Sequence, residues 1–363
     1  MTCIVPELNS GLGASQAAIL ARARALDRAG WVAGDMKAWQ SPAFTRPEVV
    51  ILAPTLDTVP SPQGSAIYTL VERLAARAPV PCVILAKWPE NRSAGWKPSS
   101  SNVLYYRRAL KPGIAERVIP FRARKWIWGT SVPHWLEYAK AAGSVCRILQ
   151  PAVVVVEDHP IFCPYVRKHG DVTFRIVLHQ HNNAPKSVRR LHWRRVLRSV
   201  DGIIFVALQT KQVTERLQGR LTVPWRVIYN GVDLEFWHPS KRRTEGEKLR
   251  AKLGIPDHAK VLLFVGRLNP GKGSVEAVEA FEFAAVRDAH FLVVGSFHVI
   301  HGHDDAYLDR LKSAANRVPG KVHLIGSVPQ SELPAYYSAS DAVIVPTIAS
   351  EGLPKVVTEA LAM

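Results

Sequence analysis

Short apolar runs alternate with longer, more polar stretches along most of the chain, beginning at about residue 49. The runs are continuous in Val, Ile and Leu and have the length of strands, as in sheets that are buried on both faces. In the first series we expect strands at 49–53, 80–86, 152–156, 174–179 and 202–207, and helices at 68–77, 135–149, 186–200 and 211–217. This alternation predicts an α/β fold in which a parallel sheet is covered by helices on both faces.

A second series of the same kind follows. Its expected strands lie at 261–265, 291–294, 322–325 and 342–345, and its expected helices at 274–286, 307–318, 331–339 and 353–363. Two such series predict two doubly wound, Rossmann-like domains. The Asn-Gly turn within residues 229–233, followed by the polar stretch 239–247, marks the joint between them.

These patterns divide the chain into three parts. Residues 49–224 form the expected first domain and residues 225–363 the second. Residues 1–48 are either an additional βα unit or an N-terminal extension outside the fold. The chain stops at Met363 inside an expected helix, so we expect the second domain to be incomplete at its end.

Composition narrows the class of protein. No apolar run approaches the ~18 residues of a membrane-spanning helix, and residues 1–30 lack the layout of a secretory signal. A cytoplasmic protein is therefore the expectation. The four cysteines are scattered without a CxxC pair, which suggests neither a zinc site nor a disulfide framework.

The charge is distributed unevenly along the sequence. The formal net charge is +17, yet residues 224–363 contain 16 basic and 16 acidic side chains. The whole excess therefore lies in residues 1–223. Such asymmetry indicates that one half of the protein faces an anionic partner and the other does not.

A glycine-rich basic loop, Gly266 to Gly273, lies between an expected strand and an expected helix. Ligands of open α/β sheets bind at the carboxyl ends of strands, where this loop falls. Arg267 supplies a planar fork for phosphate oxygens and Lys272 a compact positive charge, beside a helix N-terminus that favours anions. The alternative interpretation is a basic surface turn.

Two glutamates eight residues apart, Glu351 and Glu359, form the second motif. If both lie near one helix, they share a face about 12 Å apart, too far for a pair of glycosidase carboxylates. The spacing suits an elongated ligand rich in hydroxyl groups. Pro354 between them fits a first helical turn, whose unpaired amides can bind phosphate. The alternative is a solvated helix face.

Taken together, the pattern Gly-Arg-Leu-x3-Lys-Gly and Glu-x7-Glu resembles glycosyltransferase family 4, the group 1 family. Gly326, Tyr336, Asp341-x4-Pro346 and the segment 229–233 also fit. The resemblance is tight over residues 225–363, looser over 49–224, and does not clearly cover 1–48. It implies a GT-B fold with a cleft between two domains, a nucleotide-sugar donor, retention of anomeric configuration and no metal cofactor.

The resemblance also implies roles for individual residues. Arg267 and Lys272 would bind the donor diphosphate, Glu351 the hydroxyls of the transferred sugar and Glu359 the ribose. The full donor-binding set is Gly266, Arg267, Lys272, Glu351, Gly352, Leu353, Pro354, Lys355, Val356 and Glu359. Many family members carry Glu-Gly-Phe-Gly at this point, so Pro354 replaces the second glycine and alters one backbone contact.

Residues of the first domain are expected to complete the site. His181 follows the strand 174–179, and the resemblance places it against the donor sugar, so that His181 and Glu351 are the expected catalytic residues. His179 is expected to pack in the core and Asn182 to assist. Gly64 and Ser65 form the expected first βα turn, the donor loop of this domain. Glu157-Asp158-His159 imitates a metal motif, but no metal site is expected.

Two basic segments of the first domain, 105–128 and 186–198, interleave cations with aromatic or apolar residues. Such segments can lie on an anionic membrane surface. The alternative is a core helix with a solvated basic face. Nucleic acid is a weaker candidate, since no recognised binding motif accompanies the charge.

The sequence therefore predicts a hexosyl-type glycosyltransferase that acts on a glycan or lipid-linked acceptor. Strand 152–156 and the His-Gln-His-Asn segment resemble enzymes of bacterial surface polysaccharide or lipopolysaccharide synthesis, which act at the inner face of the plasma membrane. Two rivals remain: a truncated, catalytically incompetent fragment, and a basic module that binds membrane or nucleic acid.

Overall fold

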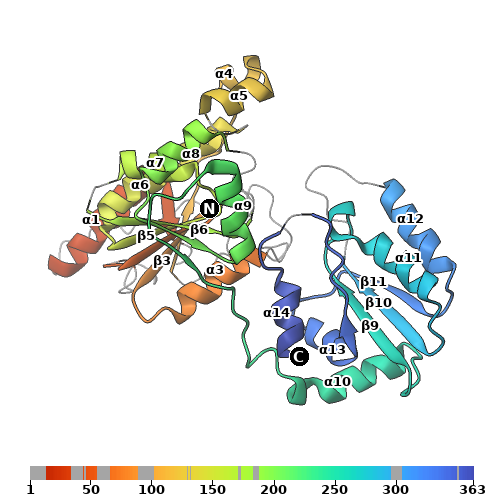
Figure 1. Cartoon of the computed structure of the whole chain (residues 1–363). Coiled ribbons are helices and arrows are strands. Elements are labelled where there is room, and N and C mark those ends of the chain that lie inside the picture. Colours follow the sequence, from red (N-terminus) through yellow and green to blue (C-terminus); the bar gives the residue numbers. More distant parts are fainter. Residues whose placement is uncertain are drawn as a thin grey trace. The chain divides into compact units, whose positions relative to one another are not determined.

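The computed structural model separates the chain into two compact units, Met1–Tyr229 and Asn230–Met363, which are described separately (Figure 1). The structure describes residues 14–33, 44, 46–54, 66–88, 102–128, 130, 132–170, 173–182, 188–295, 305–349 and 351–363. The division falls within the segment 229–233 that the turn chemistry marks, a few residues after the boundary expected at 224.

The first unit is built on a sheet with the strand order β1-β4-β3-β2-β5-β6-β7-β8. All neighbouring strands are parallel except β1, which runs antiparallel to β4. The strands are β1 (Trp31–Ala33), β2 (Val49–Leu52), β3 (Cys82–Lys87), β4 (Val103–Tyr106), β5 (Val153–Glu157), β6 (Arg175–Gln180), β7 (Gly202–Phe205) and β8 (Trp225–Val227). The expected parallel sheet is therefore present.

Helices pack on both faces of this sheet, because alternate strand residues point to opposite sides. Val50 and Leu52 of β2 belong to one apolar core and Ile51 to another. The helices are α1 (Ala14–Arg28), α3 (Ala66–Arg77), α4 (Ile114–Val118), α5 (Phe121–Trp128), α6 (Leu136–Leu149), α7 (Phe162–His169), α8 (Arg190–Leu197) and α9 (Leu208–Gln218). Continuous apolar strands follow from burial on both faces.

The described residues before position 49 are part of this first unit. Leu26 of α1 and Trp31 of β1 are fully buried in the larger core. The Trp31 ring lies 5.1 Å from the ring of Tyr106 and 5.5 Å from that of Tyr138. The sequence left the status of residues 1–48 open; the structure gives α1 and β1 a place in the first domain rather than outside it.

The second unit has a parallel sheet with the order β11-β10-β9-β12. Its strands are β9 (Lys260–Val265), β10 (Ala289–Val294), β11 (Val322–Gly326) and β12 (Ala342–Val343), and its helices are α10 (Pro239–Lys252), α11 (Ser274–Ala284), α12 (Asp305–Asn316), α13 (Leu333–Ser338) and α14 (Lys355–Ala362). The second βα series is therefore also a Rossmann-like layer.

The polar stretch 239–247, for which the sequence pattern predicts no helix or strand, belongs to helix α10. Arg250 of α10 donates hydrogen bonds to the Ala339 carbonyl and to Asp341. A Cβ on Gly246 would come within 2.7 Å of the Ser338 backbone, so α10 lies close against α13. The apolar pattern does not reveal this helix, because polar contacts, rather than an apolar face, fasten part of it to the second unit.

The segment 105–128 also differs from a continuous basic surface. Tyr105 is fully buried and Tyr106 nearly so, because both belong to strand β4. The exposed cations of this segment begin with Arg107 and Arg108, after strand β4, and continue through the loop at Lys111 into α4 and α5. No helix in the described part of the chain is long and apolar enough to cross a membrane.

Helices α6 and α7 approach closely at Gly143, and this contact gives a test of the first unit. A Cβ there would come within 2.7 Å of the Val166 carbonyl oxygen and 3.0 Å of the Gly170 nitrogen. Helix propensity alone favours alanine by about 1 kcal/mol. We expect Gly143→Ala instead to destabilise the protein by about 1–3 kcal/mol, as overpacking does.

Chemical denaturation followed by tryptophan fluorescence measures this change. Ser144→Ala, at the neighbouring half-buried position, is the control and should alter stability by less than about 0.5 kcal/mol. A more stable Gly143→Ala variant would contradict the close approach of the two helices.

Candidate functional site

In the second unit, the basic loop follows strand β9 and leads into helix α11. Gly266 donates its N–H to the Val294 carbonyl, and the Asn269 side chain accepts the N–H of Lys272, which shapes the turn. Gly273 has φ +70°, and a Cβ there would lie 2.2 Å from the Pro346 carbonyl oxygen. Only glycine fits this position, because a side chain would be strained and would also collide.

The same loop is pinned to the chain that leads to the second motif. The Gly271 carbonyl accepts hydrogen bonds from the N–H groups of Ile348 and Ala349. Lys272 Nζ lies 2.5 Å from Glu351 Oε1, although 79 residues separate them. Arg267 is exposed on this loop. The structure therefore brings Lys272 and Glu351 together, with Arg267 on the same loop. Their roles toward a donor stay predictions.

Glu359 lies in a different setting from Glu351. It is buried in α14, and the Tyr337 hydroxyl donates to its Oε2 at 2.9 Å. Glu351 precedes the helix, and Pro354 caps it with an extended backbone, φ −62° and ψ 129°. The prediction that both glutamates share one helix face is wrong, because only Glu359 is helical. Their assigned roles toward sugar and ribose stay predictions.

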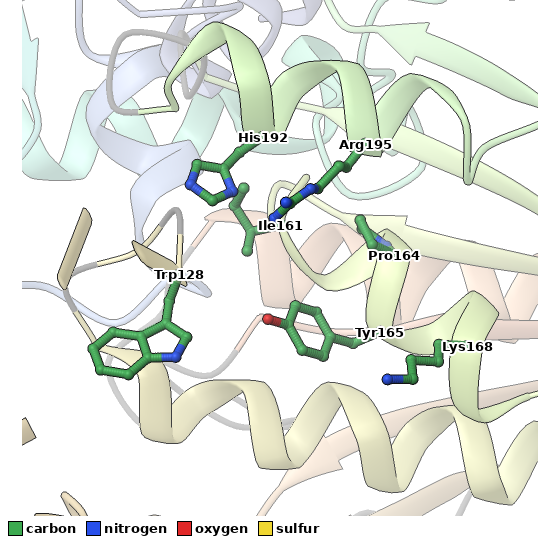
Figure 2. Close-up of a pocket in the computed structure, with 7 residues that line it drawn as sticks. All are labelled: Trp128, Ile161, Pro164, Tyr165, Lys168, His192 and Arg195. Carbon is green, nitrogen blue, oxygen red and sulfur yellow. The ribbon is translucent and has the colours of Figure 1, made fainter. Parts of the chain in front are cut away.

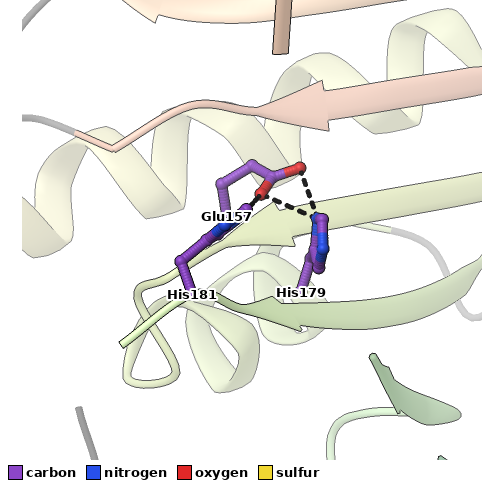
Figure 3. A group of neighbouring side chains, drawn as sticks. All are labelled: Glu157, His179 and His181. Carbon is purple, nitrogen blue, oxygen red and sulfur yellow. Dashed lines mark hydrogen bonds and ion pairs between the residues drawn. The ribbon is translucent and has the colours of Figure 1, made fainter. Parts of the chain in front are cut away.

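In the first unit, the ends of β5 and β6 bring three side chains together (Figure 3). Glu157 Oε2 lies 2.7 Å from His181 Nε2 and 3.1 Å from His179 Nδ1. The two imidazole rings are 4.2 Å apart between centroids. Glu157, His179 and His181 are all buried, with Glu157 only 1% exposed. His179 is therefore a partner of the carboxylate and not only a packing residue.

Asp158, the residue after Glu157, fixes the backbone at His181 through hydrogen bonds. Its Oδ1 accepts the N–H groups of both His181 and Asn182, each at 3.0 Å. Its Oδ2 accepts from the Asn182 amide nitrogen at 2.5 Å. Asp158 has φ +50°, which asparagine and aspartate tolerate better than most residues. Asn182 is therefore tied to Asp158, and its expected part at the donor site stays a prediction.

Charge explains why the buried carboxylate is stable. Burial by itself raises the pKa of Glu157, but the two histidines outweigh this and lower it to about 2. Burial lowers the pKa of His181, whereas the hydrogen bond and charge of Glu157, with Asp158, raise it above its usual value. Glu157 and His181 therefore form a buried ion pair with the imidazole favoured in its charged form.

Glutamate and histidine are also metal-ligand types, and the ligand atoms of these three residues lie within 4.8 Å of one another. Around a tetrahedral ion such as zinc, however, neighbouring ligand atoms lie roughly 3.3 Å apart. The separation between Glu157 and His181 is that of a hydrogen bond. We therefore interpret the group as an ion-pair network.

The residues expected at the site are divided between the two units. Gly352, Leu353, Lys355 and Val356 lie half-buried around the start of α14, near Glu351 in the chain. Gly64 and Ser65 lie outside the described residues. Sequence reasoning missed the pairing of Glu157 with His181. The signal was present, since both residues follow buried strands, but it required knowing that β5 and β6 are neighbours.

Comparisons with known proteins identify the family of the chain. Residues 63–236 match the family described as "Glycosyltransferase Family 4", and residues 245–363 match "Glycosyl transferases group 1". The chain is 34% identical over 125 residues to the D-inositol 3-phosphate glycosyltransferase of Corynebacterium glutamicum. This match covers 33% of the chain and 29% of that relative.

A longer match extends over both units. The chain is 24% identical over 311 residues to the lipopolysaccharide 1,2-N-acetylglucosaminetransferase of Salmonella typhimurium, covering 83% of the chain and 74% of the relative.

Two solved structures share the fold at low sequence identity. Anabaena HepE, crystallised with UDP and glucose, is 15% identical, with a TM-score of 0.59 over 87% of this chain and 78% of that one. Sucrose-phosphate synthase from Thermosynechococcus elongatus is 18% identical, with a TM-score of 0.61 over 86% and 79%. The two family matches cover both units in succession, and the chain therefore belongs to glycosyltransferase family 4, the group 1 transferases of the GT-B fold.

Proposed function

We propose that this protein transfers a hexose from a nucleoside diphosphate sugar to a glycan or lipid-linked acceptor, with retention of anomeric configuration. The observation that carries the proposal is the convergence of Lys272 and Glu351, a phosphate-binding cation and a hydroxyl-binding carboxylate, at one strand edge. Families that match both units support it.

The proposed chemistry depends on charge at the leaving group. Departure of the nucleoside diphosphate develops negative charge on phosphate oxygens. Arg267, Lys272 and the N-terminus of α11 provide positive charge and N–H groups for that charge, an electrostatic effect that often dominates catalysis. When phosphate engages Lys272, Glu351 is released toward the sugar hydroxyls. This arrangement operates without a metal ion.

His181 is the proposed catalytic residue of the first unit. Its Nε2 faces Glu157, so Glu157 keeps the imidazole charged and fixes its ring. A charged imidazole presents a donor to an electronegative substrate oxygen. His181 would contact the donor sugar, as the family resemblance implies, with Glu157 as its positioning residue.

The acceptor is proposed from chemistry and from the names of relatives. One relative is named for lipopolysaccharide and another for D-inositol 3-phosphate, a charged polyol. We propose a role in bacterial surface polysaccharide or lipopolysaccharide synthesis at the cytoplasmic face of the plasma membrane. The basic first unit would hold the acceptor, since the net positive charge lies there.

A titration of UDP and GDP against the purified protein tests the donor site. We expect saturable binding of one nucleotide, and a loss of at least about 100-fold in affinity for the variant Arg267→Ala/Lys272→Ala, because each charged hydrogen bond contributes about 1.5–3 kcal/mol. Isothermal calorimetry in excess EDTA measures both and should give the same affinity with and without the chelator.

The matched control is Arg287→Ala/Lys312→Ala, two exposed cations of the same unit away from the loop. It should bind like the unchanged protein. Absence of binding to either nucleotide would sink the donor site and favour a catalytically incompetent protein.

The buried ion pair generates a pH-dependent prediction. Because the pKa of His181 is raised on folding, its stabilisation is complete below about pH 6.5 and is lost as pH rises through the folded value. Because the pKa of Glu157 is lowered, its part is present above about pH 4.3 and is lost toward pH 2. We expect Glu157→Gln to cost on the order of 3 kcal/mol, most strongly between these limits.

Thermal unfolding at a series of pH values measures this difference. Glu137→Gln is the control, because the Glu137 side chain is 60% exposed and pairs with Lys140 at the surface; we expect it to cost less than about 1 kcal/mol. A cost of Glu157→Gln that does not vary with pH would contradict the ion pair.

A second proposal concerns the membrane. Large apolar side chains of α4, α5 and α8 are exposed: Ile114 (81%), Val118 (75%), Trp126 (62%), Ile127 (41%) and Leu191 (59%). Arg122, Arg194 and Arg198 are exposed on the same helices. Helix α5 lies on α8, since the Trp126 carbonyl contacts His192 at 3.0 Å. We propose that this α4–α5–α8 surface binds an anionic bilayer.

Vesicle sedimentation tests that surface. Replacing Arg122, Arg194 and Arg198 with Gln should weaken binding to phosphatidylglycerol vesicles at least about 100-fold, since each cation near the surface contributes about 1 kcal/mol. Phosphatidylcholine vesicles should bind weakly in every case. The control replaces Arg287 and Lys312. Unchanged binding of the triple variant, or stronger binding to duplex DNA than to vesicles, would overturn the proposal.

A further inference from the structure

A pocket of about 340 Å³ lies in the first unit between helices α7 and α8 and the end of α5 (Figure 2). It is separate from the donor loop, which belongs to the second unit. Trp128, Tyr165 and His192 supply rings to its walls, and Lys168 and Arg195 supply cations. The volume lies at the lower end of the range for small-molecule sites, so it suits one sugar unit rather than a long chain.

The walls of this pocket are held by contacts outside it. His192 Nε2 donates to the Trp126 carbonyl at 3.0 Å, which fastens α5 to α8. The Arg189 guanidinium lies 5.8 Å from the centroid of the Trp126 ring and reinforces this contact. Arg190 Nε donates to the Leu217 carbonyl, tying α8 to α9. The pocket is therefore formed before any ligand arrives.

The pocket is positively charged, because its lining includes two cations and no carboxylate. No aspartate or glutamate is among its lining residues. Lys168 and Arg195 are exposed and, among the residues that the structure describes, make no ion pair with a carboxylate. Burial raises the pKa of Tyr165, and the charges of Lys140 and then Arg195 oppose this rise. An anion entering here would meet both cations and the hydroxyl.

The aromatic rings of Trp128, Tyr165 and His192 add a preference for sugar rings to the preference for anions. In Figure 2 the Tyr165 hydroxyl points toward the space beside Trp128 and His192, while Lys168 and Arg195 stand along α7 and α8. Aromatic faces carry partial negative charge, so they attract the slightly positive C–H face of a sugar ring. Inorganic phosphate would use only the cations, whereas an anionic sugar would use both features.

The pocket is linked to the proposed catalytic histidine through a short connection. Ile161 lines the pocket and follows Glu157 by four residues, after the end of β5. Between them, Asp158 holds the backbone of His181, and the ring of His159 packs 4.7 Å from that of Phe162. A ligand seated here therefore lies on the unit that carries His181.

We propose that this pocket binds an anionic sugar unit of the acceptor, a phosphorylated or carboxylated sugar, with its ring on Trp128 and Tyr165 and its anion on Arg195 and Lys168. This inference rests on the proposed function, since it names the acceptor class of the same transferase. Arg195, with its planar fork, pairs the two oxygens of a phosphate or carboxylate; Lys168 adds a point charge.

Isothermal calorimetry with four probes tests the pocket: glucose 6-phosphate, glucuronate, neutral glucose and inorganic phosphate. We expect at least one of the two anionic sugars to bind at least about tenfold more tightly than glucose or inorganic phosphate. The stronger of the two identifies the anion. Equal binding of inorganic phosphate and glucose 6-phosphate, or no binding of either anionic sugar, would overturn the proposal.

Variants locate the binding. Arg195→Gln and Lys168→Gln should each weaken the anionic sugar about tenfold or more and leave glucose unchanged, and Trp128→Ala should weaken it without changing the salt dependence. The controls are Arg198→Gln, directly after α8, and Trp225→Ala, on β8, both outside the pocket lining. Equal losses in variants and controls would contradict the assignment.

The donor-site variant separates this inference from the function on which it rests. Arg267→Ala/Lys272→Ala should lose nucleotide and keep the anionic sugar. If nucleotide binds and the sugar does not, the pocket assignment fails and the transferase proposal stands. If neither nucleotide binds while the sugar binds with the expected variant pattern, the transferase proposal fails and the pocket remains as a sugar site.

Discussion

Parallel pairing of strands is the constraint on which the rest of this structure depends. Parallel neighbours must each be reached by a crossover, so the parallel strands of a unit all end at the same edge of its sheet. In the first unit this rule places Glu157 of β5 beside the end of β6, where His179 and His181 lie. In the second it places the loop after β9 beside the chain that follows β12. Both groups of polar residues are consequences of strand order.

Burial then decides what those polar groups can do. Glu157 is almost fully buried, which would favour a neutral carboxyl, yet two imidazoles hold it as an anion. At the loop after β9 the charged groups are more accessible, since Arg267 is exposed and the Lys272–Glu351 pair is only partly buried. The charged groups at Glu157 are therefore buried inside the protein, whereas those at the loop after β9 are accessible to a ligand.

Much of the fold could be predicted because local patterns were strong. Apolar runs such as 49–53 and 261–265 became β2 and β9 with small shifts, and the strands of both sheets are parallel as expected, apart from the antiparallel β1. The errors fell where local pattern and tertiary role disagree. Helix α10 is polar along its length, so the apolar pattern does not predict it. Tyr105 lies in a segment whose composition indicates a basic surface, yet it is fully buried in β4.

The sequence by itself determined the chemistry of this protein: the glycine at position 273, the cations Arg267 and Lys272, and the excess positive charge of the first unit. Only the tertiary structure decided which of these residues meet. Glu351 reaches Lys272 across 79 residues, and Glu157 reaches His181 across 24, because strand order and crossover packing set such distances. These pairings depend on contacts between residues that are remote in sequence, and a local sequence pattern does not predict such contacts.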